Sequence, residues 1–314
     1  MNHCCVIGGD GFIGTWVVDR LVQRKKKVTI IDRNSEPTRI HPEAARYVVG
    51  DYGQKSFLKQ ALQGVDEVIH LAYSTVPKTS FEDPVEDIRN NLPATVTLLD
   101  VASSVGVDKF ILMSSGGTVY GKVDKVPISE DHPTNPISPY GITKLATEKY
   151  AMMFSELKGL PVICVRPGNA YGEGQKPFVG QGFVGTAIAS VLKGRQVTVF
   201  GETGTIRDYI HVADIADGII AVLEHGRANS CYNVGTGVGR SNKDILAEIA
   251  TFAESAGLKL RVNTLPPRPF DVPANVLDST KLINQTGWKI SVSFEEGIKR
   301  TWDWFLTGHA GDNK

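Results

Sequence analysis

Long apolar runs are missing from this chain of 314 residues, and so is an excess of charge of either sign. No run reaches the ~18 residues of a membrane-spanning helix, and no signal peptide is visible where the N-terminus enters a predicted strand. The 34 basic and 34 acidic residues balance. The composition therefore favours neither a nucleic acid nor an anionic membrane as partner, and we expect a cytoplasmic protein.

Cysteine is scarce, and its spacing carries no metal or redox motif. The four cysteines lie in apolar, strand-like segments without CxxC spacing. This pattern favours buried, reduced thiols over disulfides or a zinc site, so no metal is predicted. The cysteines are Cys4, Cys5, Cys164 and Cys231.

Short apolar strands alternate with helical patterns through the first half of the chain. Alternation of this kind predicts a doubly wound parallel sheet, the Rossmann fold, whose strands all end at one edge, where ligands bind. Strands are expected at 3–8, 27–32, 46–49, 66–71, 108–114 and 160–166, and helices at about 12–24, 54–63, 84–105 and 138–158.

Glycine and proline become dense after residue 167, which indicates a second, smaller mixed α/β lobe that binds substrate. The strand at 230–234 and the helix near 213–225 are expected to return to the first sheet. We predict an NAD-binding Rossmann domain over 1–168, to which about 206–235 returns, and mainly a substrate-binding lobe over 169–314. The other elements expected there are helices near 182–193, 241–256, 279–285 and 294–306, and strands near 197–200 and 206–210.

The first predicted strand runs into the loop GGDGFIG at 8–14, which has the spacing of a dinucleotide-binding turn. Gly8 permits a tight turn, Gly11 lets the backbone approach a pyrophosphate, and Gly14 lets the helix pack on the strand. The helix that follows would present the N–H groups around Phe12 and Ile13 to the phosphates. The strand before the loop and the amphipathic helix after it support this interpretation.

Asp32 ends the second predicted strand, where a carboxylate accepts hydrogen bonds from both hydroxyls of the adenosine ribose and repels a 2′-phosphate. NAD is therefore expected rather than NADP, with Arg33 next to it as the feature that argues the other way. A turn-forming role is the alternative for Asp51. The remaining expected cofactor contacts, after the third and fourth strands, are Asp51, Tyr52, Leu71 and Ala72.

Tyr140 and Lys144 are four residues apart at the start of a predicted helix, which places both side chains on one helical face. A neighbouring ammonium favours the phenolate and lowers the pKa of a tyrosine, so the pair can act as a base. The same spacing also arises by chance on surface helices. The glycine loop and Asp32, predicted at the same sheet edge, favour the functional interpretation.

Taken together, the ordered motifs resemble those of the extended short-chain dehydrogenase/reductase family, and most closely its nucleotide-sugar 4-epimerases, typified by UDP-glucose 4-epimerase. The resemblance covers about residues 1–305. The motifs are GGDGFIG, Asp32, HLA at 70–72, SSGGTVYG at 114–121, YGITK at 140–144, RPGNAYG at 166–172 and RDYIHVADIADG at 207–218.

The resemblance implies NAD as cofactor and a catalytic role for the tyrosine and lysine. Tyr140 would be the base, and Lys144 would support it and bind the nicotinamide ribose. Ser114 and Pro167, at the ends of two further strands, would contact the cofactor.

It also implies a set of substrate contacts. Asn169 would meet the first phosphate of the substrate, Arg207 would grip the diphosphate, and Arg268 and Asp271 would hold the diphosphate and the nucleoside ribose. Guanidinium groups match phosphate oxygens in pairs, which agrees with these roles. The alternative for Arg207 is a salt bridge between the lobes.

Two positions depart from the family pattern. Gly116 stands where the family usually has a serine or threonine that binds the reacting hydroxyl, so Thr118 is expected to take over, with Ser115 as the second candidate. Asn275 stands where sugar-restricted relatives have a tyrosine, so we expect tolerance of a bulkier substituent at C2 or C5.

The resemblance implies an NAD-dependent enzyme that inverts C4 of a UDP-hexose, in the glucose/galactose, N-acetyl or uronate form, through a 4-keto intermediate. A UDP-glucuronate decarboxylase or a 4-ketosugar reductase of the same family is the alternative. A 4,6-dehydratase is disfavoured because Gly117 and Thr118 replace its usual acidic pair. A non-catalytic dinucleotide sensor is disfavoured because Tyr140 and Lys144 are both kept.

Relatives often form dimers through two helices, and the corresponding segments here are those near 84–105 and 138–158. A homodimer is therefore expected, with ordinary packing of these helices on the sheet as the alternative.

Overall fold

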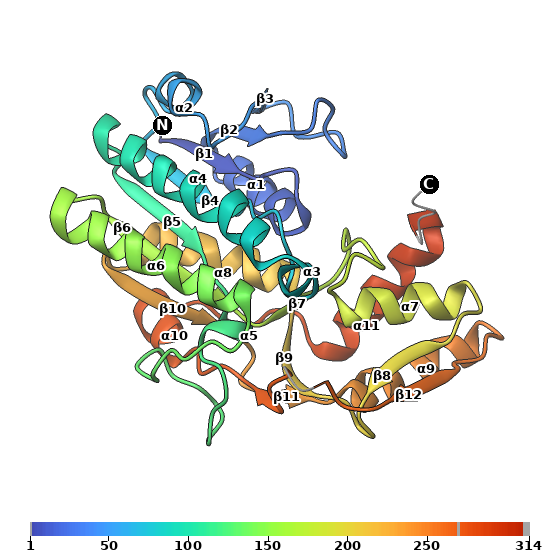
Figure 1. Ribbon diagram of the computed structural model, residues 1–314. Helices are drawn as coiled ribbons and strands as arrows, with labels where there is room; N and C mark the ends of the chain where they lie inside the picture. Colours follow the sequence, from blue (N-terminus) through green and yellow to red (C-terminus); the bar gives the residue numbers. More distant parts are fainter. Residues whose placement is uncertain (1, 269–270, 310–314) are drawn as a thin grey trace.

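The computed structural model describes residues 2–268 and 271–309. Seven parallel strands form its main sheet, in the order β10-β6-β5-β4-β1-β2-β3. The first six strands of the chain thus follow the doubly wound order of the Rossmann fold, so the predicted fold class is confirmed (Figure 1). The strands are β1 (His3–Ile7), β2 (Lys27–Asp32), β3 (Ala45–Val49), β4 (Glu67–His70), β5 (Lys109–Met113), β6 (Val162–Pro167) and β10 (Ser230–Val234).

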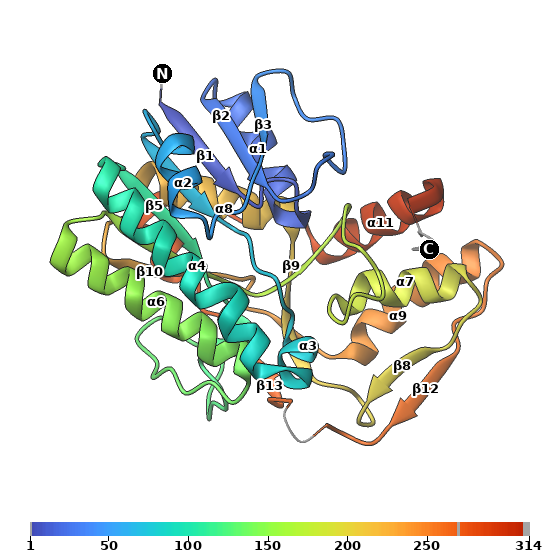
Figure 2. The same ribbon diagram turned by 45° about the horizontal axis from the view of Figure 1, so that its top comes forward.

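Helices cover both faces of this sheet, because its strands are apolar on both sides. On one face, α1 (Phe12–Gln23) and α8 (Val212–His225) pack against one apolar core. On the other, α2 (Lys55–Ala61), α4 (Pro84–Val105) and α6 (Pro139–Lys158) pack against a second core. The long helices α4 and α6 run side by side in both ribbon views (Figure 1, Figure 2).

The start of α6 is set by local signals in the sequence. Ser138 caps the helix by accepting a hydrogen bond from the amide of Gly141 at 3.1 Å, and Pro139 occupies its first turn. The helix ends at Gly159, whose φ of +70° favours glycine. Tyr140 is therefore held in the first turn of a well-defined helix.

A smaller lobe is built from the second half of the chain. It contains α7 (Phe183–Leu192), α9 (Asn242–Ser255) and α11 (Phe294–Trp304), which share an apolar core. A four-stranded sheet joins the lobes: β9 (Ile206–His211) lies between β11 (Gly239–Arg240) and β13 (Ala274–Asn275), and β7 (Asn169–Tyr171) also pairs with β9. A two-stranded sheet pairs β8 (Val197–Phe200) with β12 (Val262–Leu265).

The chain crosses between the lobes more than once. β10 joins the main sheet beside β6, as predicted, and α10 (Thr280–Thr286) packs against β10 and α8. The strand predicted at 206–210 lies in the four-stranded sheet instead. The exact domain boundaries stay a prediction.

The predicted long elements agree with the structure to within a few residues. Short elements were missed because two to six residues do not reveal a period. They are α3 (Pro77–Glu82), α5 (Gly116–Val119), η1 (Phe305–His309), β7, β11, β12 and β13.

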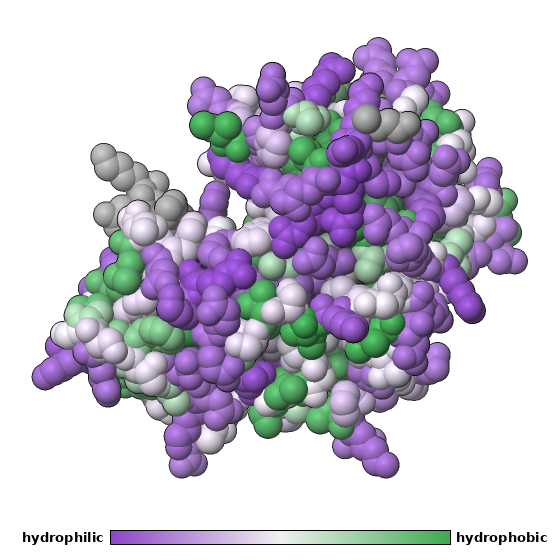
Figure 3. Space-filling view, turned by 180° about the vertical axis from the view of Figure 1, so that it is seen from behind, coloured by the Kyte–Doolittle hydropathy of each residue, from purple (hydrophilic) through white to green (hydrophobic). Residues whose placement is uncertain are grey.

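The described part of the chain contains no helix that is long and apolar enough to cross a membrane. The face opposite α4 and α6 is mostly hydrophilic, with apolar side chains in separate small groups (Figure 3).

Candidate active site

The glycine loop lies between the end of β1 and the start of α1. Gly8 has a φ of +79°, and a Cβ on it would lie 2.8 Å from the amide nitrogen of Ala72. A Cβ on Gly14 would lie 2.2 Å from the carbonyl oxygen of Gly8, so strand and helix approach each other closely only without a side chain. Gly11 caps α1 with no side-chain hydrogen bond, which leaves the N–H groups of the first turn for a ligand. Those groups belong to Phe12, Ile13 and Gly14.

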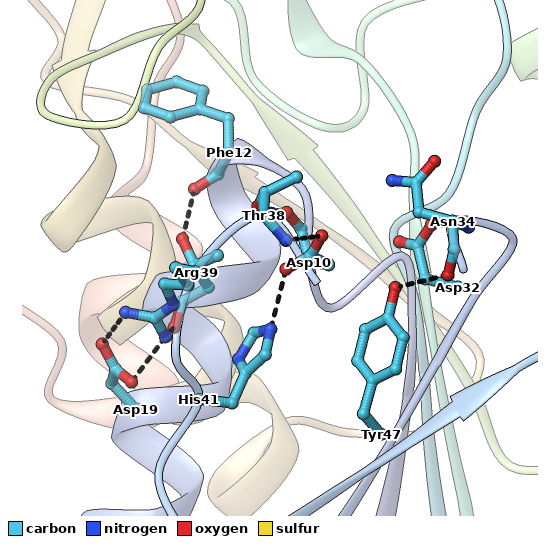
Figure 4. A network of polar contacts seen from close by, with 10 residues as sticks. Asp10, Phe12, Asp19, Asp32, Asn34, Thr38, Arg39, His41 and Tyr47 are labelled. Atoms are coloured by element: carbon cyan, nitrogen blue, oxygen red, sulfur yellow. Dashed lines mark hydrogen bonds and ion pairs between the residues drawn. The ribbon is translucent and has the colours of Figure 1, made fainter. Parts of the chain in front are cut away.

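The segment between β2 and β3 is fastened to this loop through Asp10, to which the spacing gave no role (Figure 4). The buried Asp10 carboxylate accepts a hydrogen bond from the amide of Thr38 at 2.8 Å and lies 2.7 Å from Nε2 of His41. Arg39 pairs with Asp19 on α1 at 2.6 Å. The protein's own side chains thus hold the chain after β2 against the glycine loop.

Asp32 and Asp51 both lie at the carboxyl edge, in different arrangements. Asp32 ends β2, and one carboxylate oxygen accepts a hydrogen bond from the amide of Asn34 at 3.3 Å. Asp51 is exposed and accepts from the amide of Gly53 at 2.8 Å, which is the turn-forming arrangement considered above. Arg33 is also exposed. The geometry is compatible with ribose binding by Asp32 and shows Asp51 in a turn, and contact of Asp51 with the cofactor stays a prediction.

The end of β4 lies beside Tyr52. The amide groups of Leu71 and Ala72 both donate to the carbonyl oxygen of Ile7, at 2.9 and 3.0 Å, which holds the end of β4 against β1. The ring of Tyr52 packs on His70 with centroids 5.0 Å apart, and burial raises the pKa of Tyr52 to about 12. The end of β4 and Tyr52 thus lie at the same edge of the sheet as the glycine loop.

Ser114 directly follows β5, and Pro167 is the last residue of β6. The amide of Ser114 donates to the carbonyl oxygen of Val165 at 2.8 Å, while its hydroxyl is buried and meets no hydrogen-bond partner among the described residues. Pro167 pairs with Val234 across β6 and β10. A buried hydroxyl of this kind at a ligand edge indicates a bound group that would satisfy it.

Tyr140 and Lys144 lie together, as predicted, on one face of α6. The ammonium of Lys144 is buried and lies 5.7 Å from the centre of the Tyr140 ring. It donates a hydrogen bond to the carbonyl oxygen of Met113 at 2.9 Å. The backbone amide of Tyr140 donates to the hydroxyl of Ser80 on α3 at 3.2 Å. The pair is therefore placed by β5 and α3 as well as by its own helix.

In the protein alone the pKa of Tyr140 is not lowered, although Lys144 lies nearby. Burial raises the pKa of Tyr140, and the carboxylate of Asp87 adds to this shift. Burial also lowers the pKa of Lys144 to about 7, although Asp87 and Glu148 oppose this effect. The pattern had shown the neighbouring cation but not how far both groups are removed from water.

The site contains residues that sequence reasoning missed. Tyr73, just after β4, lies with its ring 5.0 Å from that of Tyr140. Asp87 on α4 is fully buried and bonded to the hydroxyl of Thr75. Ser80 holds the amide of Tyr140. Tyr73 directly follows the HLA motif, which is the one signal that could have drawn attention to it.

Gly116 cannot accept a side chain without a local shift. A Cβ there would lie 2.5 Å from Cδ1 of Leu277 and 2.9 Å from the carbonyl oxygen of Arg166. In this chain, Leu277 and the backbone at Arg166 therefore occupy the space that the family's usual hydroxyl side chain would need.

Both candidate replacements for that hydroxyl lie in or next to α5. Oγ1 of Thr118 is buried without a hydrogen-bond partner among the residues described. The carbonyl of Thr118 lies against Gly141, the residue after Tyr140, where a Cβ would be 2.9 Å away. Ser115 precedes α5, and its hydroxyl does not cap the helix.

The four-stranded sheet brings three predicted substrate contacts together. Arg207 on β9 is in register with Asn275 on β13, and Asn169 on β7 is in register with Tyr209 on β9. Nη1 of Arg207 donates to the carbonyl oxygens of the chain at positions 206 and 272, each at 2.8 Å, rather than forming the salt bridge considered as the alternative. The side-chain amide of Asn275 donates to the carbonyl oxygen of Gly116 at 3.0 Å, which joins this sheet to the loop of α5.

Arg268 and Asp271 form a two-bonded ion pair. Nε and Nη2 of Arg268 donate to the two carboxylate oxygens of Asp271 at 2.8 and 3.1 Å. The guanidinium lies 4.4 Å from the centre of the Phe200 ring. Both charged groups also act on Arg207, whose pKa is lowered mainly by burial.

The residues of this edge fit NAD. The glycine loop offers free N–H groups where any Cβ on Gly8 or Gly14 would collide, Asp32 ends β2, and the hydroxyl of Ser114 is buried without a partner among the described residues. The free N–H groups suit the phosphates of the cofactor, Asp32 suits its adenosine ribose, and the hydroxyl of Ser114 suits a further polar group.

Comparison with known proteins gives the same result. Residues 4–235 match the NAD dependent epimerase/dehydratase family. UDP-glucose 4-epimerase of Mycolicibacterium smegmatis is 34% identical over 307 residues, which cover 96% of this chain and 97% of that protein.

Two solved structures are similar over almost their whole length. UDP-glucose 4-epimerase of Thermus thermophilus in complex with NAD has a TM-score of 0.90 at 34% identity, covering 98% of this chain and 99% of that one. UDP-glucose 4-epimerase of Thermotoga maritima with UDP-glucose has a TM-score of 0.90 at 32% identity, covering 97% and 99%.

Fold and site together define an enzyme of the extended short-chain dehydrogenase/reductase class that uses NAD. Within this class, the chain belongs to the NAD dependent epimerase/dehydratase family. The predicted resemblance and the predicted cofactor are both confirmed.

Proposed function

We propose that this enzyme inverts the configuration at C4 of a UDP-hexose through a 4-keto intermediate. The observation that carries the proposal is the Tyr140/Lys144 pair at the carboxyl edge of the sheet, in which the Lys144 ammonium is buried and lies 5.7 Å from the centre of the half-buried Tyr140 ring. The similarity to UDP-glucose 4-epimerases supports it.

Tyr140 acts as the base that removes the proton from the 4-hydroxyl of the sugar and later returns it. Lys144 lies beside the phenol, where its positive charge favours the phenolate. NAD, held by the glycine loop and Asp32, would supply the hydride acceptor and donor for the reaction at C4.

The diphosphate of the substrate is held while the ketone turns. Arg207 and the Arg268/Asp271 pair lie near one another at β13, and Asn169 lies on the neighbouring strand β7. Guanidinium groups at two points would anchor the phosphates, and Asp271 would accept from the nucleoside ribose. Binding energy far from C4 thus retains a freely turning intermediate.

Thr118 supplies the hydroxyl that Gly116 lacks. Its Oγ1 is buried without a partner among the described residues, and its backbone adjoins the first turn of α6. Ser115 is the alternative. Oδ1 of Asn275 is also buried and unpartnered within the described chain, which supports a polar sugar substituent, such as an acetamido or carboxylate group, at this place.

The test uses the purified protein with UDP-glucose, UDP-N-acetylglucosamine or UDP-glucuronate, without added cofactor, and follows the anomeric signals by proton NMR. Appearance of the C4 epimer supports the proposal and names the sugar. A pentose product from UDP-glucuronate would instead identify a decarboxylase. An unchanged spectrum for all three sugars would contradict the proposal and favour a reductase or a sensor.

A second copy of this chain is proposed as partner, through α4 and α6. Leu98 and Leu99 of α4 are fully buried against the sheet and take no part in such a contact. Other apolar residues are exposed on these two helices. They are Val85, Ile88, Ile142, Tyr150, Met153 and Leu157, all exposed.

A further inference from the structure

Tyr73 lies closer to the ammonium of Lys144 than Tyr140 does. Nζ of Lys144 is 3.9 Å from the centre of the Tyr73 ring and 5.7 Å from that of Tyr140. The two tyrosine rings are 5.0 Å apart and meet edge to face, at 71°. A cation within ~6 Å of a ring face is attracted by the electron density of that face. The three side chains therefore form one contacting cluster, in which the ammonium of Lys144 lies over the ring of Tyr73.

Few other groups compensate the charge of Lys144. Its hydrogen-bond partner within the described residues is the carbonyl of Met113. Glu148, on the same helix, is occupied by Arg166 through two bonds of 2.9 and 2.6 Å. His70 from β4 adds no positive charge, because burial lowers its pKa to about 3.

Asp87 from α4 is the remaining charged group that acts on this ammonium. It also acts on Tyr140 and Tyr73, where it raises the pKa of both phenols and so opposes the phenolate. Tyr52 is the further titratable group near Tyr73. An aromatic face differs from a carboxylate in this position, because it stabilises the cation of Lys144 without placing a negative charge beside Tyr140.

We propose that Tyr73 is a positioning residue of the Tyr140/Lys144 pair: its ring face holds the ammonium of Lys144, and its ring also braces that of Tyr140. This inference rests on the proposed function of that pair. The ring is the active part of Tyr73, since the ammonium lies over the ring and the hydroxyl is buried beside Thr143.

The test compares Tyr73→Phe, which keeps the ring face, with Tyr73→Leu, which keeps an apolar side chain but has no ring. The holoenzyme is prepared with isotope-labelled lysine, and the Lys144 signal is assigned by its loss in Lys144→Met. Its titration is followed by NMR. This readout needs no sugar, so it is separate from the test of the proposed function.

Tyr73→Leu should lower the titration midpoint of Lys144 by on the order of one pH unit, because the charged form loses its aromatic partner. Tyr73→Phe should leave the midpoint within a few tenths of a unit. The alkaline limb of the turnover profile should move in the same direction as the midpoint. Turnover should fall by roughly ten-fold in Tyr73→Leu and by less than about three-fold in Tyr73→Phe.

An equal shift in Tyr73→Phe and Tyr73→Leu, or no shift in either, would overturn the proposal. A mere packing role would lower turnover without moving the Lys144 midpoint. Should Tyr73→Leu fail to fold, fluorinated phenylalanines at position 73 serve instead, since fluorine withdraws electron density from the ring face while nearly keeping its shape. The midpoint should then fall stepwise with the number of fluorines, and a constant midpoint would contradict the inference.

Discussion

The ammonium of Lys144 donates a hydrogen bond to the carbonyl oxygen of Met113, 2.9 Å away. This bond joins α6 to the last residue of β5. The next residue in the chain is Ser114, whose hydroxyl is buried. Strand β5 thus sets the position of the lysine as much as the helix does. A displacement of β5 relative to α6 would move the base and its cation together.

Replacement of the proposed base, Tyr140→Phe, should lower kcat by roughly 10²–10⁴-fold, because a general base contributes about that much. The ring contact with Tyr73 remains in this variant, so the fold and NAD binding should persist. Turnover is measured by NMR, and bound NAD by its release on denaturation. Full turnover in Tyr140→Phe would show that another group removes the proton.

Lys144→Met should have a larger free energy of unfolding than the wild-type protein at pH 6, and this difference should be smaller at higher pH. Burial lowers the pKa of Lys144 to about 7, whereas an unfolded lysine titrates near ~10.4. Below pH 7 the folded protein carries a buried charge. Between pH 7 and ~10.4 only the unfolded chain keeps the proton, so the stability of the wild-type protein falls as pH is lowered through this range and rises as pH increases.

The difference in free energy of unfolding between Lys144→Met and wild type should therefore shrink by roughly 3 kcal/mol from pH 6 to pH 9. Denaturant unfolding at several pH values measures it. Lys149→Met, on the exposed side of the same helix, is the matched control and should show a difference that hardly changes with pH. A constant difference for Lys144→Met would mean that this lysine stays charged throughout.

Gly116→Ser, which restores the usual residue of the family, should destabilise this protein by about 1–3 kcal/mol rather than improve catalysis. The new Cβ would lie 2.5 Å from Leu277 and 2.9 Å from a carbonyl oxygen, so the loop must shift. Melting temperature and turnover are the measurements.

Gly117→Ser is the matched control for stability, since its Cβ would lie 3.4 Å from Asn169, an ordinary contact. It should melt close to the wild-type temperature. If Gly116→Ser were as stable as Gly117→Ser and more active, the loop would have room for the hydroxyl, and the role proposed for Thr118 would be unnecessary.

Leu157→Asp should convert the expected dimer into a monomer. Leu157 is 70% exposed on α6 within one chain, so a charge there does not disturb the fold but opposes burial against a second copy. Sedimentation velocity measures the change. Ile290→Asp replaces an exposed apolar residue in the other half of the chain and should leave the oligomeric state as it is. A wild-type protein that sediments as a monomer would contradict the proposed partner.

Much of the fold could be predicted from local pattern. Strands of the main sheet are continuous apolar runs, and Ser138, Pro139 and Gly159 mark both ends of α6. The short strands β7, β11 and β13 could not be predicted, because pairing with β9 defines them and a few residues carry no period.

The residues of the site also fall into those that could be predicted from the sequence and those that could not. Gly8, Asp32, Tyr140 and Lys144 could be found because each belongs to a spacing with a chemical reason. Tyr73 and Asp87 could not, because their proximity to Lys144 depends on how α4 and the end of β4 pack against α6. Side-chain direction on α4 also depends on that packing, which buries Leu98 and Leu99 completely.

The return of the chain to the main sheet has a consequence for synthesis. β10 covers the edge of β6, and Ile215, Ile219 and Ile220 of α8 fill the core beneath α1. Until residue 234 has left the ribosome, β6 is an unpaired edge and that core is open to water. A nascent chain that stops at residue 168 should therefore aggregate, and folding of the dinucleotide site must wait for a segment made after the first part of the other lobe.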